Sequence, residues 1–351
     1  MRTRTRLYGT LGLVLATTVT AASIPWWPDG GSDTTASAPG HRDQAITAVT
    51  KLKDQATAVA EALRSGKEVL IEEATTATSQ TWARPDGQLR SEFTAVPQRA
   101  KTGDGRWAAI DNTLRTTETG VQPLQPYTPV TFSNGSQPGA KESVLATVET
   151  KTGQPITYTW PGPLPTPTLD GTRALYSEVR TGVDLLVVAR QEGGFGHVLI
   201  VKNREAATDK SLSSLTYGLR ADGAVFRHDA TTGGVRIHDA KTGAEVGGIP
   251  TPMAWDSAGK DPESPETPRL SVASTTDVLK LSALDGAEPG SKQTPMPSRL
   301  DGDGTSTATL HLDATGILSD PNVKFPVLLD PTINPGEQAW LFVSKSHANS
   351  N

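Results

Sequence analysis

The chain contains no cysteine in its 351 residues. This absence excludes disulfides, thiol catalysis, cysteine-ligated metals and a lipid anchor on an N-terminal cysteine. A chain of this length can bury enough apolar surface to fold without such cross-links. An exported form of it must therefore be held together by its own hydrophobic core.

Aromatic residues make up only 5% of the chain, and the net charge of −5 leaves no basic excess. We therefore expect neither nucleic acid nor an anionic membrane as a partner. The sequence has no His-Glu-x-x-His zinc motif and no Gly-x-Ser-x-Gly nucleophile elbow. The Gly-rich stretch 193–196 lies between two predicted strands, not between a strand and a helix, so it is no phosphate loop. We predict no cofactor and no catalytic residue.

Glycine and proline are abundant, with 33 and 26 residues, and they follow no period. This composition is typical of short strands joined by many turns. Turn signals recur every eight to twelve residues, which indicates a sandwich or an open barrel. The predicted fold class is mainly β, with antiparallel β-sandwich-like meanders and one N-terminal amphipathic helix.

The first residues are typical of a signal peptide. Arg2, Arg4 and Arg6 precede a short apolar stretch at 7–19, and small residues follow. We predict a signal peptide over 1–22, cleaved near Ala21 or Ala22, and a secreted or cell-surface product with no stable membrane span after cleavage. The alternative is an uncleaved N-terminal anchor, which the short apolar stretch disfavours.

A Pro-, Gly-, Ser- and Thr-rich spacer is predicted over 23–41, and an amphipathic helix over 42–66. Apolar residues recur in the helical segment at three- and four-residue steps. They are Ile46, Val49, Leu52, Ala56, Val59 and Leu63. This stripe requires a covering surface, either the neighbouring β domain or a partner helix.

Beyond the helix we predict a first β subdomain over 67–168 and a second over 169–335. Residues 336–351 are expected to begin a truncated further strand or module. Residues 183–188 form a nearly continuous apolar run before a Gly-rich turn, which predicts a hairpin strand that is buried on both faces. A further strand is predicted over 278–283.

Five short sequence motifs, or phrases, resemble those of a known family. They are Trp82-Ala83-Arg84-Pro85-Asp86-Gly87, Asp104-Gly105-Arg106-Trp107 to Leu114, Tyr176 to Leu185, Gly248 to Asp256, and Phe325 to Thr332. In this order they resemble the N-terminal region of large secreted actinobacterial surface proteins that continue into LamG-like, DNRLRE or RHS-repeat modules. The resemblance implies a non-catalytic β-rich scaffold, whose partners would be cell-wall or extracellular polysaccharide or downstream modules of the same protein.

Three groups of residues are candidate sites of chemistry. Asp301-Gly302-Asp303-Gly304 starts like a calcium loop, but Thr305 and Leu312 stand where further ligands are needed, so a plain turn is predicted. His228 and His238 could face one another on consecutive strands, without the further ligands that a zinc site needs. Glu178 and Asp184 flank a turn, and we expect both to be solvated.

Tryptophans are the remaining candidate binding residues. Trp82, Trp107, Trp160 and Trp255 could stack on sugar rings if they lined one exposed face. The opposing interpretation places them in the core or in cross-strand packing, and the phrases around Trp82 and Trp107 predict such a pair. Three functions therefore stay open: a scaffold module, a polysaccharide-binding module, and a secreted hydrolase of unrecognised type.

Overall fold

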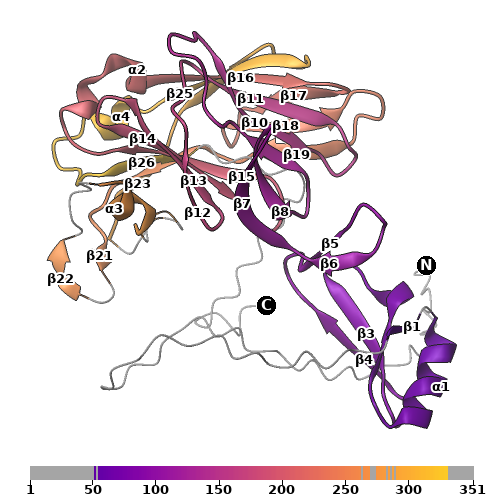
Figure 1. The fold of residues 1–351 in the computed structure, drawn as a ribbon. Coiled ribbons are helices and arrows are strands. Elements are labelled where there is room, and N and C mark those ends of the chain that lie inside the picture. The colour runs from indigo at the N-terminus through magenta and orange to yellow at the C-terminus, as the bar shows by residue number, and fades with distance from the viewer. Residues whose placement is uncertain are drawn as a thin grey trace, which may run out of the picture. The chain divides into compact units, whose positions relative to one another are not determined.

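The computed structural model describes residues 51–52, 54–261, 264–268, 274–281, 284, 287 and 290–330. The predicted signal peptide, the spacer and the segment 336–351 lie outside these residues. The described chain is mainly β with antiparallel sheets, as predicted. It divides into two compact units, Met1–Thr94 and Ala95–Asn351 (Figure 1). No helix in the described ranges is long and apolar enough to cross a membrane.

The first unit is a small sheet packed against one helix. Its strands lie in the order β1 (Lys51–Leu52), β2 (Val69–Ile71), β3 (Ser79–Ala83) and β4 (Leu89–Phe93). A 3-10 turn, η1, covers Glu72–Ala74. The turn between β3 and β4 contains Asp86-Gly87, a favoured hairpin turn pair, with Gly87 at φ 79°.

The helix of this unit, α1, is shorter than the predicted segment 42–66. It covers Gln55–Ser65, because Asp54 caps its start by accepting from Thr57 N at 2.9 Å, and Gly66 ends it in the left-handed conformation. Lys51–Leu52, inside the predicted helix, is a strand instead; residues 42–50 lie outside the described part. Ala58 and Ala62 are buried against the sheet, although neither belongs to the predicted stripe. Of the described stripe residues, Val59 packs against this cluster, whereas Ala56 and Leu63 are exposed.

The second unit contains two large sheets that share one core (Figure 1). The larger sheet has eight strands, in the order β24 (Ser298–Asp301), β25 (Thr307–Asp313), β16 (Ser214–Ala221), β11 (Pro155–Trp160), β10 (Ser143–Glu149), β9 (Val130–Phe132), β8 (Gly120–Gln125) and β7 (Asp111–Thr117). The other has seven, in the order β12 (Thr168–Asp170), β13 (Arg173–Arg180), β14 (Val183–Ala189), β15 (Phe195–Val201), β26 (Val327–Asp330), β20 (Met253–Trp255) and β23 (Gln293–Pro295).

Smaller elements complete the second unit. Its short sheets are β5 (Arg99–Lys101) with β6 (Trp107–Ala109), β17 (Ala224–Asp229) with β18 (Gly234–Asp239) and β19 (Glu245–Ile249), and β21 (Lys260–Asp261) with β22 (Ser264–Pro268). Its helical turns are η2 (Ala206–Thr208), α2 (Lys210–Ser213), α3 (Thr275–Leu279) and α4 (Thr315–Leu318).

The predicted boundary at residue 168 is not where the chain divides. Strand β11, on one side of that boundary, pairs with β16 on the other side. One apolar core also runs from Leu114 to Leu329. The Pro-rich stretch 161–167 is therefore a connection within one sandwich, and the structural division falls at Thr94.

The central hairpin is buried on both faces, as the apolar run 183–188 predicts. Leu185 and Leu199 face the core between the large sheets. Leu186 and Ile200 face a second apolar cluster, which contains Val278 of α3. The predicted strand 278–283 is wrong at its start, because Ser274 caps a helix there by accepting from Asp277 N. Residues 282–283 lie outside the described part.

Candidate functional site

One cluster of charged side chains lies at the end of the central hairpin. Asp184 is the second residue of β14, and Lys202 directly follows β15. The register pairs Val183 with Val201, so Asp184 and Lys202 are diagonal neighbours. Lys202 Nζ lies 2.8 Å from Asp184 Oδ1, and the Asp184 side chain is only 1% exposed.

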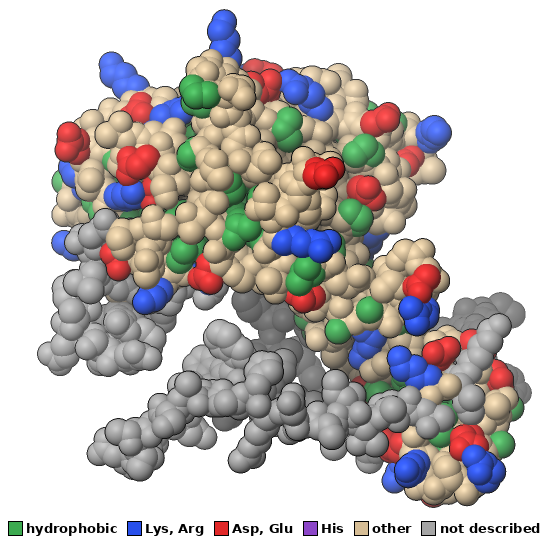
Figure 2. Space-filling view, viewed as in Figure 1, with side chains coloured by type: hydrophobic (Ala, Val, Ile, Leu, Met, Phe, Trp, Pro, Cys, Tyr) green, Lys and Arg blue, Asp and Glu red, His purple; other side chains and the backbone are tan. Residues whose placement is uncertain are grey.

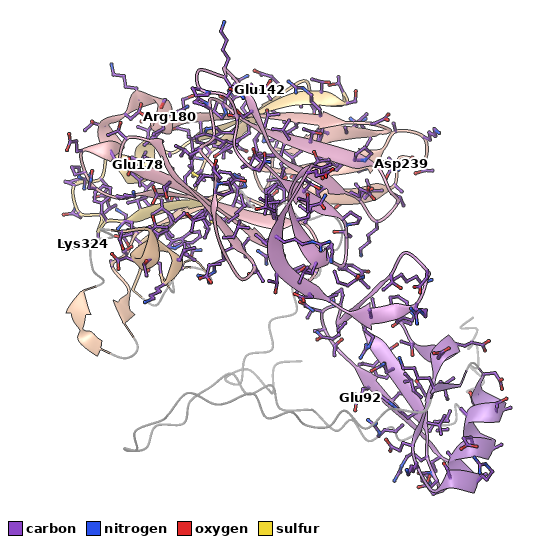
Figure 3. The ribbon with its side chains drawn as sticks, in the orientation of Figure 1. Glu92, Glu142, Glu178, Arg180, Asp239 and Lys324 are labelled. Carbon is purple, nitrogen blue, oxygen red and sulfur yellow. The ribbon has the colours of Figure 1, made fainter. Side chains whose placement is uncertain are left out.

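Glu178 completes this cluster from β13, where the pairing with β14 is irregular between Tyr176 and Arg180. Its Oε1 lies 2.6 Å from Lys202 Nζ, and its backbone N–H donates to Asp184 Oδ1 at 2.8 Å. Its Oε2 accepts from Gly182 N at 2.8 Å. Glu178, labelled in Figure 3, is the one non-glycine residue with positive φ in the described ranges, at 55°.

Hydrogen bonds within the cluster shift the pKa values of Lys202 and Glu178. Partial burial acts to lower the pKa of Lys202, but hydrogen bonds from its amine to Asp184 and Glu178 outweigh that effect and raise it above its usual value. Burial acts to raise the pKa of Glu178, and the Lys202 amine and the Gly182 N–H reverse this and lower it. Both side chains are therefore charged at neutral pH.

The prediction that Asp184 is solvated is wrong. Residue alternation places Asp184 on the same face of β14 as Leu186, and its partner across the ladder is the buried Ile200. Only Glu178 meets the expectation of exposure, at 53%. A buried carboxylate needs compensating hydrogen bonds, and Lys202 with the Glu178 N–H provides them.

A second polar cluster lies between the two large sheets. Tyr158 and Tyr217 from the eight-stranded sheet meet His197 from the seven-stranded one, with ring centroids 5.0 to 5.2 Å apart. Tyr158 Oη lies 3.3 Å from His197 Nε2. His197 Nδ1 and Tyr217 Oη have no hydrogen-bond partner among the described residues.

Burial sets the protonation of this interior cluster. It lowers the pKa of His197 to about 3, so the ring is neutral at physiological pH. It raises the pKa of Tyr158 well above its usual value, with smaller contributions from Tyr217 and Asp330. These groups are enclosed by the aromatic rings of Phe195 and Tyr217 and cannot meet a substrate in solution.

Asp256, a second buried acid, connects separate segments of backbone. Its Oδ1 accepts from Lys292 N at 2.6 Å and from Ala258 N at 3.2 Å, and its Oδ2 accepts from Lys324 N at 3.0 Å. Its side chain is 1% exposed. A carboxylate used in this way holds three chain segments together and has no free face for a ligand.

The four candidate tryptophans do not form one binding face. Trp160 and Trp255 are 1% and 4% exposed and belong to two apolar clusters, so they cannot stack on a sugar from solvent. Trp82 in β3 and Trp107 in β6 are half-buried and belong to different sheets, so they are not cross-strand partners of each other.

Each half-buried tryptophan instead meets a cation from its own hairpin. The Arg90 guanidinium carbon lies 4.1 Å from the Trp82 ring centroid, and Lys101 Nζ lies 5.4 Å from that of Trp107. Both pairs are directly opposite in their ladders. The predicted tryptophan pair is therefore wrong, and each ring packs across its own ladder against a cation.

The remaining candidate residues serve turns and strands. His228 and His238 are not opposite each other, since His228 pairs with Val235 and His238 with Val225. Residues 302–304 form the predicted plain turn between β24 and β25. Within the described ranges, no group of three or more His, Asp or Glu side chains could hold a metal ion.

The sequence did not single out His197 or Lys202. A signal existed for His197, because it interrupts the apolar run of β15, where a polar side chain needs a partner. Comparison with known proteins adds no assignment: no family model, no curated protein and no solved structure matches this chain.

Proposed function

We propose that this chain is a secreted, non-catalytic structural module of a larger cell-surface protein. The proposal rests on one observation, which is the burial and the contacts of the titratable groups inside the second unit. Asp184, His197 and Asp256 are each 1% exposed or less. The two carboxylates accept main-chain N–H groups, and the histidine lies among aromatic rings. A catalytic acid or base has to reach its substrate, and these groups do not.

The surface supports the same proposal. Figure 2 shows Lys and Arg side chains interspersed with Asp and Glu over the face in view, with no large patch of one sign. A mixed surface of this kind suits a soluble spacer and gives no footprint for a strongly charged partner. The basic and apolar N-terminal segment supports export, and the resemblance of five phrases supports attachment to further modules.

Fractionation of the native organism tests this proposal. We expect the chain in the medium or the cell-wall fraction, with its N-terminus near Ala21 or Ala22. We also expect an intact mass above that of residues 22–351, because the proposal makes this chain part of a longer protein. A cytoplasmic product with an intact N-terminus would contradict export. A secreted product with the mass of residues 22–351 alone would contradict the role as a module.

Glycan binding is the competing function, and the half-buried Trp82 and Trp107 define its test. Soluble cell-wall glycans are titrated against the protein while tryptophan fluorescence is followed. The scaffold proposal expects no saturable change in the wild-type protein. A saturable change that disappears in Trp107→Ala or Trp82→Ala would replace it by a polysaccharide-binding function.

A further inference from the structure

An amine and a buried carboxyl group meet at contact distance in the central hairpin. Lys202 Nζ lies 2.8 Å from Asp184 Oδ1, and these side chains are 20% and 1% exposed. The neighbours on this face of the hairpin, Leu186 and Ile200, are fully buried. These two groups are the components of an amide bond, held together where bulk water has little access.

Glu178 touches both of these groups. Its carboxylate accepts from Lys202 Nζ at 2.6 Å, so it can carry a proton away from the amine. Its backbone N–H, 2.8 Å from Asp184 Oδ1, can hold the carboxyl oxygen as charge develops on it. Its φ of 55° is a strained conformation for a residue with a side chain. Strain of this kind concentrates at functional sites.

We propose that Lys202 and Asp184 form an intramolecular amide cross-link, with Glu178 as the proton relay. Lys202 loses one proton, which passes through Glu178 to the Asp184 carboxyl. The neutral amine attacks Cγ of Asp184 and forms a new C–N bond. One carboxyl oxygen then leaves as water with the two protons that the amine has lost. The ammonium and carboxylate become one amide and one water molecule, with no oxidant or cofactor.

Proximity is the physical basis of this reaction. Reactants held in place gain effective molarities of roughly 10⁵ to 10⁸ M, which favours condensation over hydrolysis when water is scarce. The amine starts charged, because its two carboxylate partners raise the pKa of Lys202. Loss of a proton from the amine is therefore the required first step. The product locks β14 to β15 covalently in a chain that has no disulfide. This inference stands whether or not the chain is a module of a longer protein.

Peptide mapping of the full-length purified protein tests the cross-link. Trypsin does not cleave after a lysine whose amine is an amide. We expect Thr181–Arg190 joined to Gln191–Arg204, uncleaved at Lys202, with a mass one water below the sum of the two peptides. Fragmentation should place the bond between Asp184 and Lys202. Quantitative recovery of a separate peptide ending at Lys202 would overturn the proposal.

Two variants test the assigned roles. Lys202→Arg keeps the positive charge but lacks the nucleophilic amine, so its peptides should stay separate. A joined species in that variant would overturn the choice of Lys202. Glu178→Gln keeps the size of the side chain, and its cross-link should form about a hundredfold more slowly or not at all. Formation at the wild-type rate would overturn the relay. Mapping at peptide level separates this water loss from dehydration at sequences such as Asp301-Gly302.

Discussion

The hydroxyl of Tyr158 lies 3.3 Å from Nε2 of His197, and the two side chains come from opposite sheets of the sandwich. The histidine is fully buried, and no carboxylate is paired with it in the contacts of its described neighbours. The ring therefore has no counter-ion that would stabilise an added proton, and the sandwich accepts it only in the neutral form.

This relationship predicts an acid-sensitive fold. The pKa of His197 is about 3 in the folded state and 6.5 in its ordinary state. As the pH falls, His197 therefore binds its proton in the unfolded chain at a higher pH than in the folded chain. Stability is fully present above pH 6.5 and falls as the pH drops toward 3. We expect a loss of about 2–3 kcal/mol in the free energy of unfolding between pH 7.5 and 4.5 from this group.

Urea unfolding at both pH values measures this loss. The variant His197→Phe should lose less stability than the wild type between pH 7.5 and 4.5. The control variant His238→Asn changes a half-buried histidine of β18 and should behave like the wild type. Both variants keep every carboxylate, so the difference between them isolates His197. An unchanged pH dependence in His197→Phe would contradict the prediction.

Two buried tyrosines should respond oppositely to loss of their hydroxyl. Tyr176 Oη donates to Ser133 O at 2.5 Å, whereas Tyr217 Oη has no partner among the described residues. We expect Tyr176→Phe to lower the free energy of unfolding by about 1–2 kcal/mol, and Tyr217→Phe to leave it unchanged or raise it by about 1 kcal/mol. Denaturant titrations compare the two. An equal loss in both would place an internal water on Tyr217.

The strained backbone at Glu178 predicts a preference for glycine. Glu178→Gly and Glu178→Ala both remove the contact with Lys202, but only alanine keeps the steric cost at φ 55°. We expect the glycine variant to be more stable than the alanine variant by about 1 kcal/mol, measured as thermal and urea midpoints. An alanine variant of equal or greater stability would show that this conformation is not strained.

An added methyl group should lower the free energy of unfolding more at Gly120 than at Gly139. Its φ is 143°, and a Cβ there would lie 2.4 Å from the backbone oxygen of Phe132. Gly139, at φ 81°, has no atom within 4 Å of such a Cβ. We expect Gly120→Ala to lose about 3 kcal/mol or more and Gly139→Ala about 1 kcal/mol. Comparable losses would contradict this ranking.

Much of the fold could be predicted from local patterns. The two-sided burial of 183–188 follows from its continuous apolar run. The helix start could not be predicted from periodicity alone, because the capping of Asp54 competes with an apolar pattern that extends further upstream. The boundary at 168 failed because sheet pairing between distant strands leaves no trace in composition.

The site was harder to predict than the fold. Glu178 and Asp184 flank a turn in the sequence, which predicts solvent exposure, whereas Asp184 lies one residue inside a buried strand. Lys202 carries no distinctive sequence signal, because a single lysine after an apolar run is also the ordinary end of a strand. Only the register of β14 and β15 brings the two together.

Strand β26 lies between β15 and β20 in the seven-stranded sheet, although it is the last strand described along the chain. During synthesis the sheet therefore remains open at its middle until residues 327–330 have emerged. Until then, the exposed edges of β15 and β20 can bind a chaperone or a neighbouring chain. A stop codon placed before residue 327 should for this reason yield an aggregating product. The pairing of β26 therefore sets the point in synthesis at which these edges are closed to self-association.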